Sequence, residues 1–144
     1  MVRANARRGR RLLSGMALLL SATTGCSQLS ARSAAACAKD LLTACNEGRY
    51  SDAESLMERT LRNAIELEAS RGGPQWGGVS GVCNAATRSQ SIVSIETREA
   101  KVQNDLAGVT LLRKFKDGSS EPYTFMVVRA DGVWRVTAMA LPQR

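Results

Sequence analysis

The hydrophobic positions of this chain follow a helical spacing first and a strand spacing later. Over residues 34–45, small and apolar residues recur at intervals of three and four, as they do along one face of an α-helix. Gly48 is expected to end this helix in the left-handed conformation that glycine adopts without strain. Ser51 and Glu54 have the spacing of a capping box, which predicts a second, short helix. A third helix is predicted over residues 58–71.

Glycine and proline interrupt the helical pattern over residues 72–89, so a long loop is expected there. After this loop, apolar residues alternate with polar ones, which is the period of a half-buried β-strand. Four strands are predicted on this basis, over residues 91–102, 108–116, 123–129 and 133–141, with Asp-Gly turns before the last two. The order of the elements, without βαβ alternation, predicts an α+β domain in which three N-terminal helices pack on a curved, mostly antiparallel sheet of four strands.

The N-terminus has a different pattern. Five arginines lie within residues 3–11 without any acidic residue, and an apolar run then extends over residues 12–24. This run is shorter than the roughly 20 apolar residues that a transmembrane helix needs, and it suits the core of an export signal. Small residues precede Cys26, and the whole segment resembles a bacterial lipoprotein signal. The resemblance implies cleavage between Gly25 and Cys26 and attachment of a lipid to the Cys26 thiol.

One position departs from the lipoprotein pattern and leaves an alternative open. Thr23 stands three residues before Cys26, where lipoprotein signals usually carry leucine. The ordinary signal peptidase could instead cleave after the alanines at 34–36, although these lie far beyond the apolar run. We expect a leader over residues 1–25, then the lipidated cysteine with a flexible tether over 26–33, and then a single α+β domain over 34–144.

Export changes the meaning of the net charge. The whole sequence carries a formal charge of +7, with 20 basic and 13 acidic residues, which by itself would favour nucleic acid or an acidic membrane as a partner. Removal of the leader takes away five arginines and leaves 15 basic residues against the same 13 acidic ones. We therefore expect no nucleic-acid partner. The expected partners are the membrane, through the lipid, and either an envelope protein or a small apolar ligand.

The remaining cysteines permit one disulfide. Cys37 and Cys45 are eight residues apart on one predicted helix, which separates them by about 12 Å along its axis, whereas bonded cysteines have Cα atoms within about 7 Å. A disulfide must therefore include Cys83. Cys37 is the favoured partner, because two helices that run out and back would return the chain to the start of the first, and Cys45 is the alternative. All three could also remain reduced as small buried hydrophobes.

Two short segments carry a resemblance to a known superfamily. Gly-Arg-Tyr-Ser-Asp-Ala at 48–53 links the first two predicted helices, and Asp-Gly-Val-Trp-Arg-Val at 131–136 begins the last strand. In this order, behind a lipoprotein leader, they are similar to the nuclear transport factor two-like (NTF2-like), or cystatin-like, superfamily, and in particular to its small bacterial lipoproteins of unknown function. The resemblance implies a cone-shaped fold whose curved sheet wraps a long helix and often leaves an apolar cavity.

Four aromatic residues are candidates for such a cavity or for a partner contact. Trp134 could line the cavity wall, or it could simply fill the core between the sheet and the helices. Phe125 and Tyr123 precede it on the neighbouring predicted strand and are candidates for the same wall. Trp76 lies in the glycine-rich loop, where it could cap the open end of the cone, contact a partner or hold the loop down.

No catalytic residue is expected. The sequence has no histidine, which excludes Ser-His-Asp and Cys-His nucleophilic sites. Without histidine or a Cys-x-x-Cys pair, no metal site and no cofactor are expected. The expected function is that of a lipid-anchored envelope protein that binds a ligand or a partner. The alternatives are a small-molecule isomerase or dehydratase of the same superfamily, which would need Asp40, Glu96 or Glu99 to face inward, and a structural component of an envelope assembly.

Overall fold

The computed structural model describes residues 21–72 and 77–140, and their side chains from residue 28 onward. The expected leader over 1–25 therefore lies mostly outside the described residues, as does Trp76. The elements follow one another in the order α1 (Ser21–Asn46), α2 (Tyr50–Ser55), α3 (Arg59–Gly72), α4 (Gly78–Thr87), β1 (Ile92–Gln103), β2 (Leu106–Phe115), β3 (Ser120–Ala130) and β4 (Val133–Met139). The strands form an antiparallel sheet in the order β1-β2-β3-β4. The predicted α+β architecture is confirmed.

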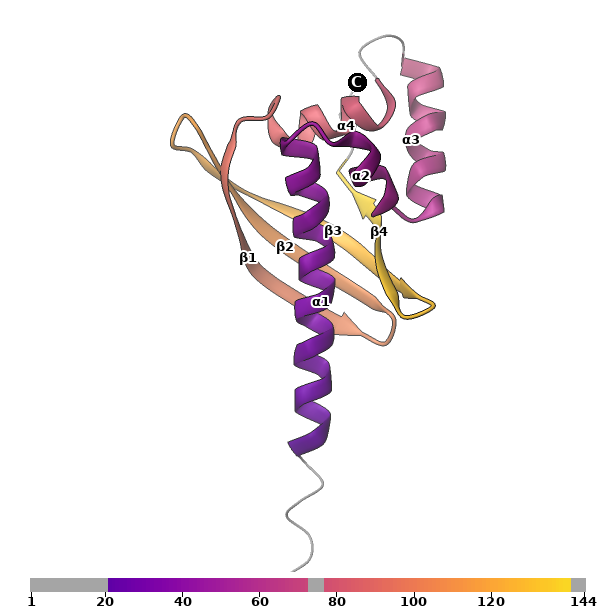
Figure 1. Cartoon of the computed structure of the whole chain (residues 1–144), viewed down its shortest axis with the longest axis vertical. Coiled ribbons are helices and arrows are strands. Elements are labelled where there is room, and N and C mark those ends of the chain that lie inside the picture. The colour runs from indigo at the N-terminus through magenta and orange to yellow at the C-terminus, as the bar shows by residue number, and fades with distance from the viewer. Residues whose placement is uncertain (1–20, 73–76, 141–144) are drawn as a thin grey trace, which may run out of the picture.

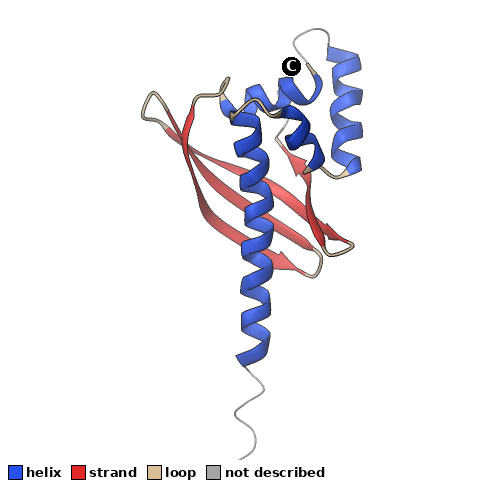
Figure 2. Ribbon diagram, viewed as in Figure 1, coloured by secondary structure: helices blue, strands red, loops and turns tan. Residues whose placement is uncertain are grey.

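The long helix α1 covers one face of the sheet (Figure 1). Its N-terminal turns extend past the sheet, while α2 and α4 pack against its C-terminal end and α3 packs against α4 and β4 (Figure 2). The core forms where α1 meets the alternating residues of β2, β3 and β4. Fully buried members of this core include Ala34, Ala38, Leu41 and Leu42 from the helix and Val109, Leu111, Phe125, Val127 and Val136 from the sheet. Each large apolar side chain buried here contributes about 1.5–3 kcal/mol to stability.

The outer edge of β4 is paired to the link between α2 and α3. The Glu58 N–H donates to the Val136 carbonyl over 2.7 Å, and the Val136 N–H donates to the Leu56 carbonyl over 2.8 Å. Met57 and Val136 thereby form a parallel bridge, and both side chains are buried. These bonds fix the link, and with it the start of α3, against the sheet.

The first helix is longer than the sequence pattern predicted. The residues expected to form a flexible tether, 26–33, are helical in the structure as part of α1. Within them the Ser33 hydroxyl donates to the Leu29 carbonyl over 3.0 Å, which is a bond of the helical i to i−4 type. No glycine or proline interrupts the chain between Gly25 and Gly48, and alanine is the strongest helix former. A polar composition therefore did not make this segment a coil.

Gly48 ends α1 as predicted. It adopts φ +72°, and the Arg49 N–H behind it donates back to the Ala44 carbonyl over 2.8 Å. This is the left-handed arrangement that closes a helix by satisfying one of its last carbonyl groups. It turns the chain sharply into α2.

The prediction of a long loop over residues 72–89 was wrong for most of that range, because α4 lies there. The buried residues of α4 are Val82, Cys83, Ala86 and Thr87, whose spacing places them on one helical face. A glycine inside a helix costs about 1 kcal/mol relative to alanine, and this packing, together with a disulfide, outweighs the cost. The domain thus has four helices within its described residues where three were predicted.

The disulfide joins Cys45 to Cys83, with Cα atoms 4.8 Å apart. The preference for Cys37 as the partner of Cys83 was wrong, and the alternative pairing of Cys45 with Cys83 is confirmed. The interpretation of all three cysteines as reduced thiols was also wrong. The physical reason is that α2 spans only 6 residues, so the chain does not return to the start of α1. It returns through α4 to the C-terminal end of α1, where Cys45 lies. Cys37 is free and buried, and its thiol donates to the Trp134 carbonyl over 3.2 Å.

Candidate functional site

The aromatic residues that were candidates for a cavity wall fill the interior. Phe125 is fully buried and Trp134 is 8% exposed, both within the core cluster. Tyr123 is partly buried against the same core, and its ring centroid lies 4.9 Å from that of Phe125. Its hydroxyl donates to the Ala140 carbonyl over 2.6 Å, and burial raises its pKa to about 12. These residues pack the sheet against the helices, which is the core interpretation given for Trp134.

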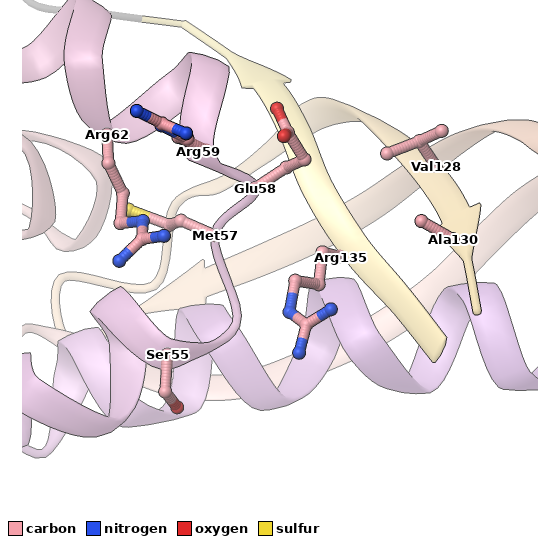
Figure 3. Close-up of a pocket in the computed structure, with 8 residues that line it drawn as sticks. All are labelled: Ser55, Met57, Glu58, Arg59, Arg62, Val128, Ala130 and Arg135. Atoms are coloured by element: carbon pink, nitrogen blue, oxygen red, sulfur yellow. The ribbon is translucent and has the colours of Figure 1, made fainter. Parts of the chain in front are cut away.

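A cavity of about 340 Å³ opens instead on the surface, where the link between α2 and α3 meets the β3–β4 edge of the sheet (Figure 3). It combines basic side chains with a few apolar ones. Its lining consists of Ser55, Met57, Glu58, Arg59, Arg62, Val128, Ala130 and Arg135.

Two elements bring the arginines of this cavity together. Arg59 and Arg62 lie one turn apart at the start of α3 and therefore share a helix face. Arg135 lies on β4, directly opposite Val128 of β3. Because Trp134 and Val136 on either side of it point into the core, the alternation of the strand directs Arg135 outward. The backbone bonds between Val136 and the α2–α3 link hold β4 and α3 in this relation.

The acidic residue of the cavity is already engaged. The Glu58 carboxylate accepts a hydrogen bond from the Thr60 N–H over 2.7 Å and so caps the first turn of α3. Hydrogen bonding from the side chain and the N–H of Thr60 holds the pKa of Glu58 below its ordinary value, and the positive charge of Arg62 lowers it further. Glu58 is therefore ionised at neutral pH. In Figure 3 its carboxylate points away from the guanidinium groups of Arg62 and Arg135, which flank the α2–α3 link.

The arginines of the cavity have no ion-pair partner within the described residues. Elsewhere in the domain Arg49 binds Glu47 and Asp52, and other arginines on the sheet and helices also hold carboxylates. Arg59, Arg62 and Arg135 form no such bridge in the part of the chain that the structure describes. With one ionised carboxylate against three guanidinium groups, the lining carries a formal charge of +2.

One donor of the cavity is buried without an acceptor. The Nε atom of Arg62 has no hydrogen-bond partner among the described residues. The Nε atom of Arg113 is also unpartnered, but the terminal nitrogens of Arg113 donate to the Ala86 carbonyl over 2.5 Å and to Glu121 over 3.3 Å. A buried donor left unsatisfied costs about 1–3 kcal/mol, and a bound water or ion is one way in which such a group is satisfied.

Arg113 belongs to a separate, structural cluster at the other end of the sheet. Its guanidinium lies 4.3 Å from the Tyr123 ring centroid, and Arg88 lies 4.1 Å from that of Phe115. Glu121 bridges both arginines. Through the bond from Arg113 to the Ala86 carbonyl, this cluster ties the end of α4 to the β2–β3 hairpin.

The structure places the remaining candidate chemistry away from any inward-facing site. Asp40, Glu96 and Glu99 are all exposed. Burial raises the pKa of the Cys37 thiol to about 11, with a smaller contribution from the charge of Asp40. Within residues 21–72 and 77–140, no three His, Cys, Asp or Glu side chains are grouped so that they could hold a metal ion. Nor does any helix in the described part of the chain have the length and apolar character needed to cross a membrane.

The sequence did not identify the three arginines. The spacing of Arg59 and Arg62 indicates a shared helix face, and the strand period indicates that Arg135 points away from the core. Neither signal shows that the two faces meet. Arg62 and Arg135 are distant in the sequence, and they line one cavity only because β4 pairs with the α2–α3 link.

Comparison with known proteins supports the fold. No protein-family model and no curated protein matches this sequence. Among solved structures, the chain is similar to the crystal structure of a Campylobacter jejuni protein provisionally named an NTF2-like transpeptidase. The two share 15% sequence identity with a TM-score of 0.54, and the match covers 70% of this chain and 94% of the other. At this identity the likeness shows the fold alone. The chain therefore has the NTF2-like fold that the segments at 48–53 and 131–136 indicated.

Proposed function

We propose that this protein is an exported lipoprotein, held to the envelope membrane through Cys26, whose NTF2-like domain acts as a binding module. The observation that carries the binding role is the cavity between α3 and β4, whose guanidinium groups lack partners in the described part of the chain. Elsewhere in the domain even an exposed arginine such as Arg49 forms ion pairs with carboxylates, whereas the arginines of this cavity form none within the described residues. Unpaired charges around a concave surface are typical of a site that receives a ligand.

Two further features support export and anchoring. The Cys45–Cys83 disulfide is of the kind that persists in oxidising compartments outside the cytoplasm. The expected leader ends just before Cys26, and the chain after it is helical. Ala31 and Arg32 already lie beside Thr97 and Ala100 of β1, so residues 26–30 would form a stalk about 7.5 Å long at 1.5 Å per residue between the domain and the membrane surface.

The enzyme alternative is less well supported. An isomerase or dehydratase of this superfamily needs a carboxyl group in an apolar cavity, whereas Asp40, Glu96 and Glu99 are exposed. The transpeptidase activity in the name of the Campylobacter jejuni protein is not carried over either. Cys37 is buried and its pKa is about 11, so its thiol is not an activated nucleophile at neutral pH.

Anchoring is tested in the native cells by intact-mass measurement and membrane fractionation. The mature protein should begin at Cys26, carry an acyl mass on that residue and sediment with the membranes. The variant Cys26→Ala should lack the acyl mass and leave the membrane fraction. Ser30→Ala is the matched control, because it changes a nearby residue of the same helix and keeps the acceptor thiol. An acyl-free mature protein, or a C26A variant that stays membrane-bound after its leader has been removed, would contradict the anchor.

The binding role is tested separately on the same extracted protein. Native mass spectrometry should show a small molecule that leaves the domain when Arg62 and Arg135 are replaced by glutamine. A ligand-free chain that crosslinks into one large envelope assembly would favour the structural alternative instead.

A further inference from the structure

The charge of the cavity between α3 and β4 points to the class of its ligand. We infer that this cavity binds the phosphate group of a small phosphorylated ligand, an inference that rests on the binding role proposed above. Its lining carries three guanidinium groups and one ionised carboxylate. A phosphate monoester carries a charge of about −1.5 to −2 at neutral pH, which matches the formal charge of +2 in the cavity.

The number of donors favours phosphate over a carboxylate. A guanidinium group presents five N–H donors in a planar fork, and it binds phosphate or carboxylate through two parallel hydrogen bonds. A single carboxylate carries one negative charge, so it neutralises only half of the formal charge of +2 in the cavity. A phosphate monoester offers three terminal oxygens and up to two negative charges, so it can accept from more than one guanidinium group. The guanidinium groups of Arg62 and Arg135 flank the α2–α3 link in Figure 3.

Within the described residues, the formal charge of +2 in this cavity is left without an ion-pair partner. Glu58 is held by the Thr60 N–H at the first turn of α3 and points away from Arg62 and Arg135. The buried Nε of Arg62 has no acceptor within the described residues. These two observations are independent of each other, and both leave the guanidinium groups open to an acceptor outside the described residues.

The shape of the cavity indicates an organic phosphate. A volume of about 340 Å³ exceeds what one phosphate group fills. The rest of the lining includes the apolar side chains of Met57, Val128 and Ala130. These side chains could cover a short carbon chain attached to the phosphate, as apolar walls do in small-molecule sites.

Isothermal titration of the full chain in nonionic detergent tests the inference. The probes are inorganic phosphate, glycerol 3-phosphate and dioctanoyl phosphatidic acid, with succinate as the carboxylate comparison. At least one phosphate probe should bind more tightly than succinate. Tightest binding of inorganic phosphate indicates a free anion, tightest binding of glycerol 3-phosphate a soluble metabolite, and tightest binding of phosphatidic acid a lipid headgroup. Succinate binding as tight as every phosphate probe, or no binding of any phosphate probe, would overturn the inference.

Substitutions assign the binding to this cavity. Arg62→Gln and Arg135→Gln should each weaken the phosphate probe by about tenfold or more, because each removes a charged hydrogen-bond donor. Arg98→Gln, an exposed arginine on β1 without an ion pair in the described residues, is the matched control and should change little. Arg62→Lys should recover part of the affinity by restoring the charge without the fork. Equal binding by R62Q, R135Q and R98Q would place the phosphate elsewhere and overturn the assignment.

The outcomes separate this inference from the anchoring proposal. A chain that is acylated on Cys26 but binds no phosphate probe retains the anchor and loses the phosphate site. A chain that binds phosphate but carries no lipid would retain the phosphate site and contradict the anchor. Urea unfolding of each variant shows whether a loss of binding is a loss of fold.

Discussion

Reduction of the Cys45–Cys83 disulfide should cost this domain a large part of its stability. The two cysteines are separated by 38 positions in the sequence. In the chain-entropy model, opening a loop of this length stabilises the unfolded state by about 4 kcal/mol at 25 °C. Domains of this size have free energies of unfolding of about 5–15 kcal/mol. The disulfide should therefore account for a third or more of the stability of a domain in the middle of that range.

Urea unfolding of the same full chain with and without reductant measures the effect. With a urea dependence of about 1.5 kcal/mol per molar, a loss of about 4 kcal/mol should lower the unfolding midpoint by roughly 2–3 M. Fluorescence of the buried Trp134 reports the transition. The comparison uses one sequence in two redox states, so no packing change from a substitution enters it.

Two controls accompany this measurement. The variant Cys37→Ala retains the disulfide, so reductant should lower its midpoint by the same amount as for the parent chain. Trypsin cleaves after Lys39, which separates Cys37 from Cys45. A non-reducing digest should therefore contain residues 40–49 linked to residues 72–88. A digest that links Cys37 to Cys83, or a midpoint that moves by less than about 0.5 M, would refute the reasoning.

Three further predictions concern single residues. Burial raises the pKa of Cys37 to about 11 from 9.0, so between these values the folded chain holds a proton that the unfolded chain loses. The free energy of unfolding should therefore fall as the pH rises from about 9 to 11. In urea titrations at each pH, Cys37→Ala should show a smaller fall. Arg113→Met should lower the free energy of unfolding by about 1.5–3 kcal/mol, because it removes the charged donor to the Ala86 carbonyl, and Lys114→Met, an exposed change on the same strand, should not. Gly48→Ala should lower the melting temperature through a cost of about 1 kcal/mol, because Gly48 has φ +72°, and an unchanged calorimetric midpoint would contradict this.

The sequence predicted the helices and strands more reliably than the contacts between them. The helical period over 34–45, the Gly48 stop and the four strands all follow from spacing within the chain, and the structure contains each of them. Spacing works here because a core-facing residue recurs with the period of its own element. The spacing rule failed over residues 72–89, where the glycines predicted a loop but packing against distant segments stabilises the helix α4.

For the candidate site, too, local features could be predicted from the sequence and long-range contacts could not. The leader and its Cys26 can be predicted from the sequence, because an export signal acts as a linear segment. The partner of Cys83 and the cavity of Arg62 and Arg135 could not, because both depend on the direction in which the chain returns. That direction is decided by the short α2, by the packing of α4 on the end of α1 and by the bonds from Val136 to the α2–α3 link.

By itself, then, the sequence determined an α+β order of elements, and it contains no histidine for a Ser-His-Asp or Cys-His site. It also predicted an export-type leader. Each of these depends only on which residues follow one another. The tertiary structure alone decided that Cys45 bonds Cys83, that Phe125 and Trp134 fill the core, and that unpaired arginines from α3 and β4 share one cavity in the described part of the chain. The physical reason is that these features are contacts between distant segments, whose free energy comes from burial and pairing in the folded chain.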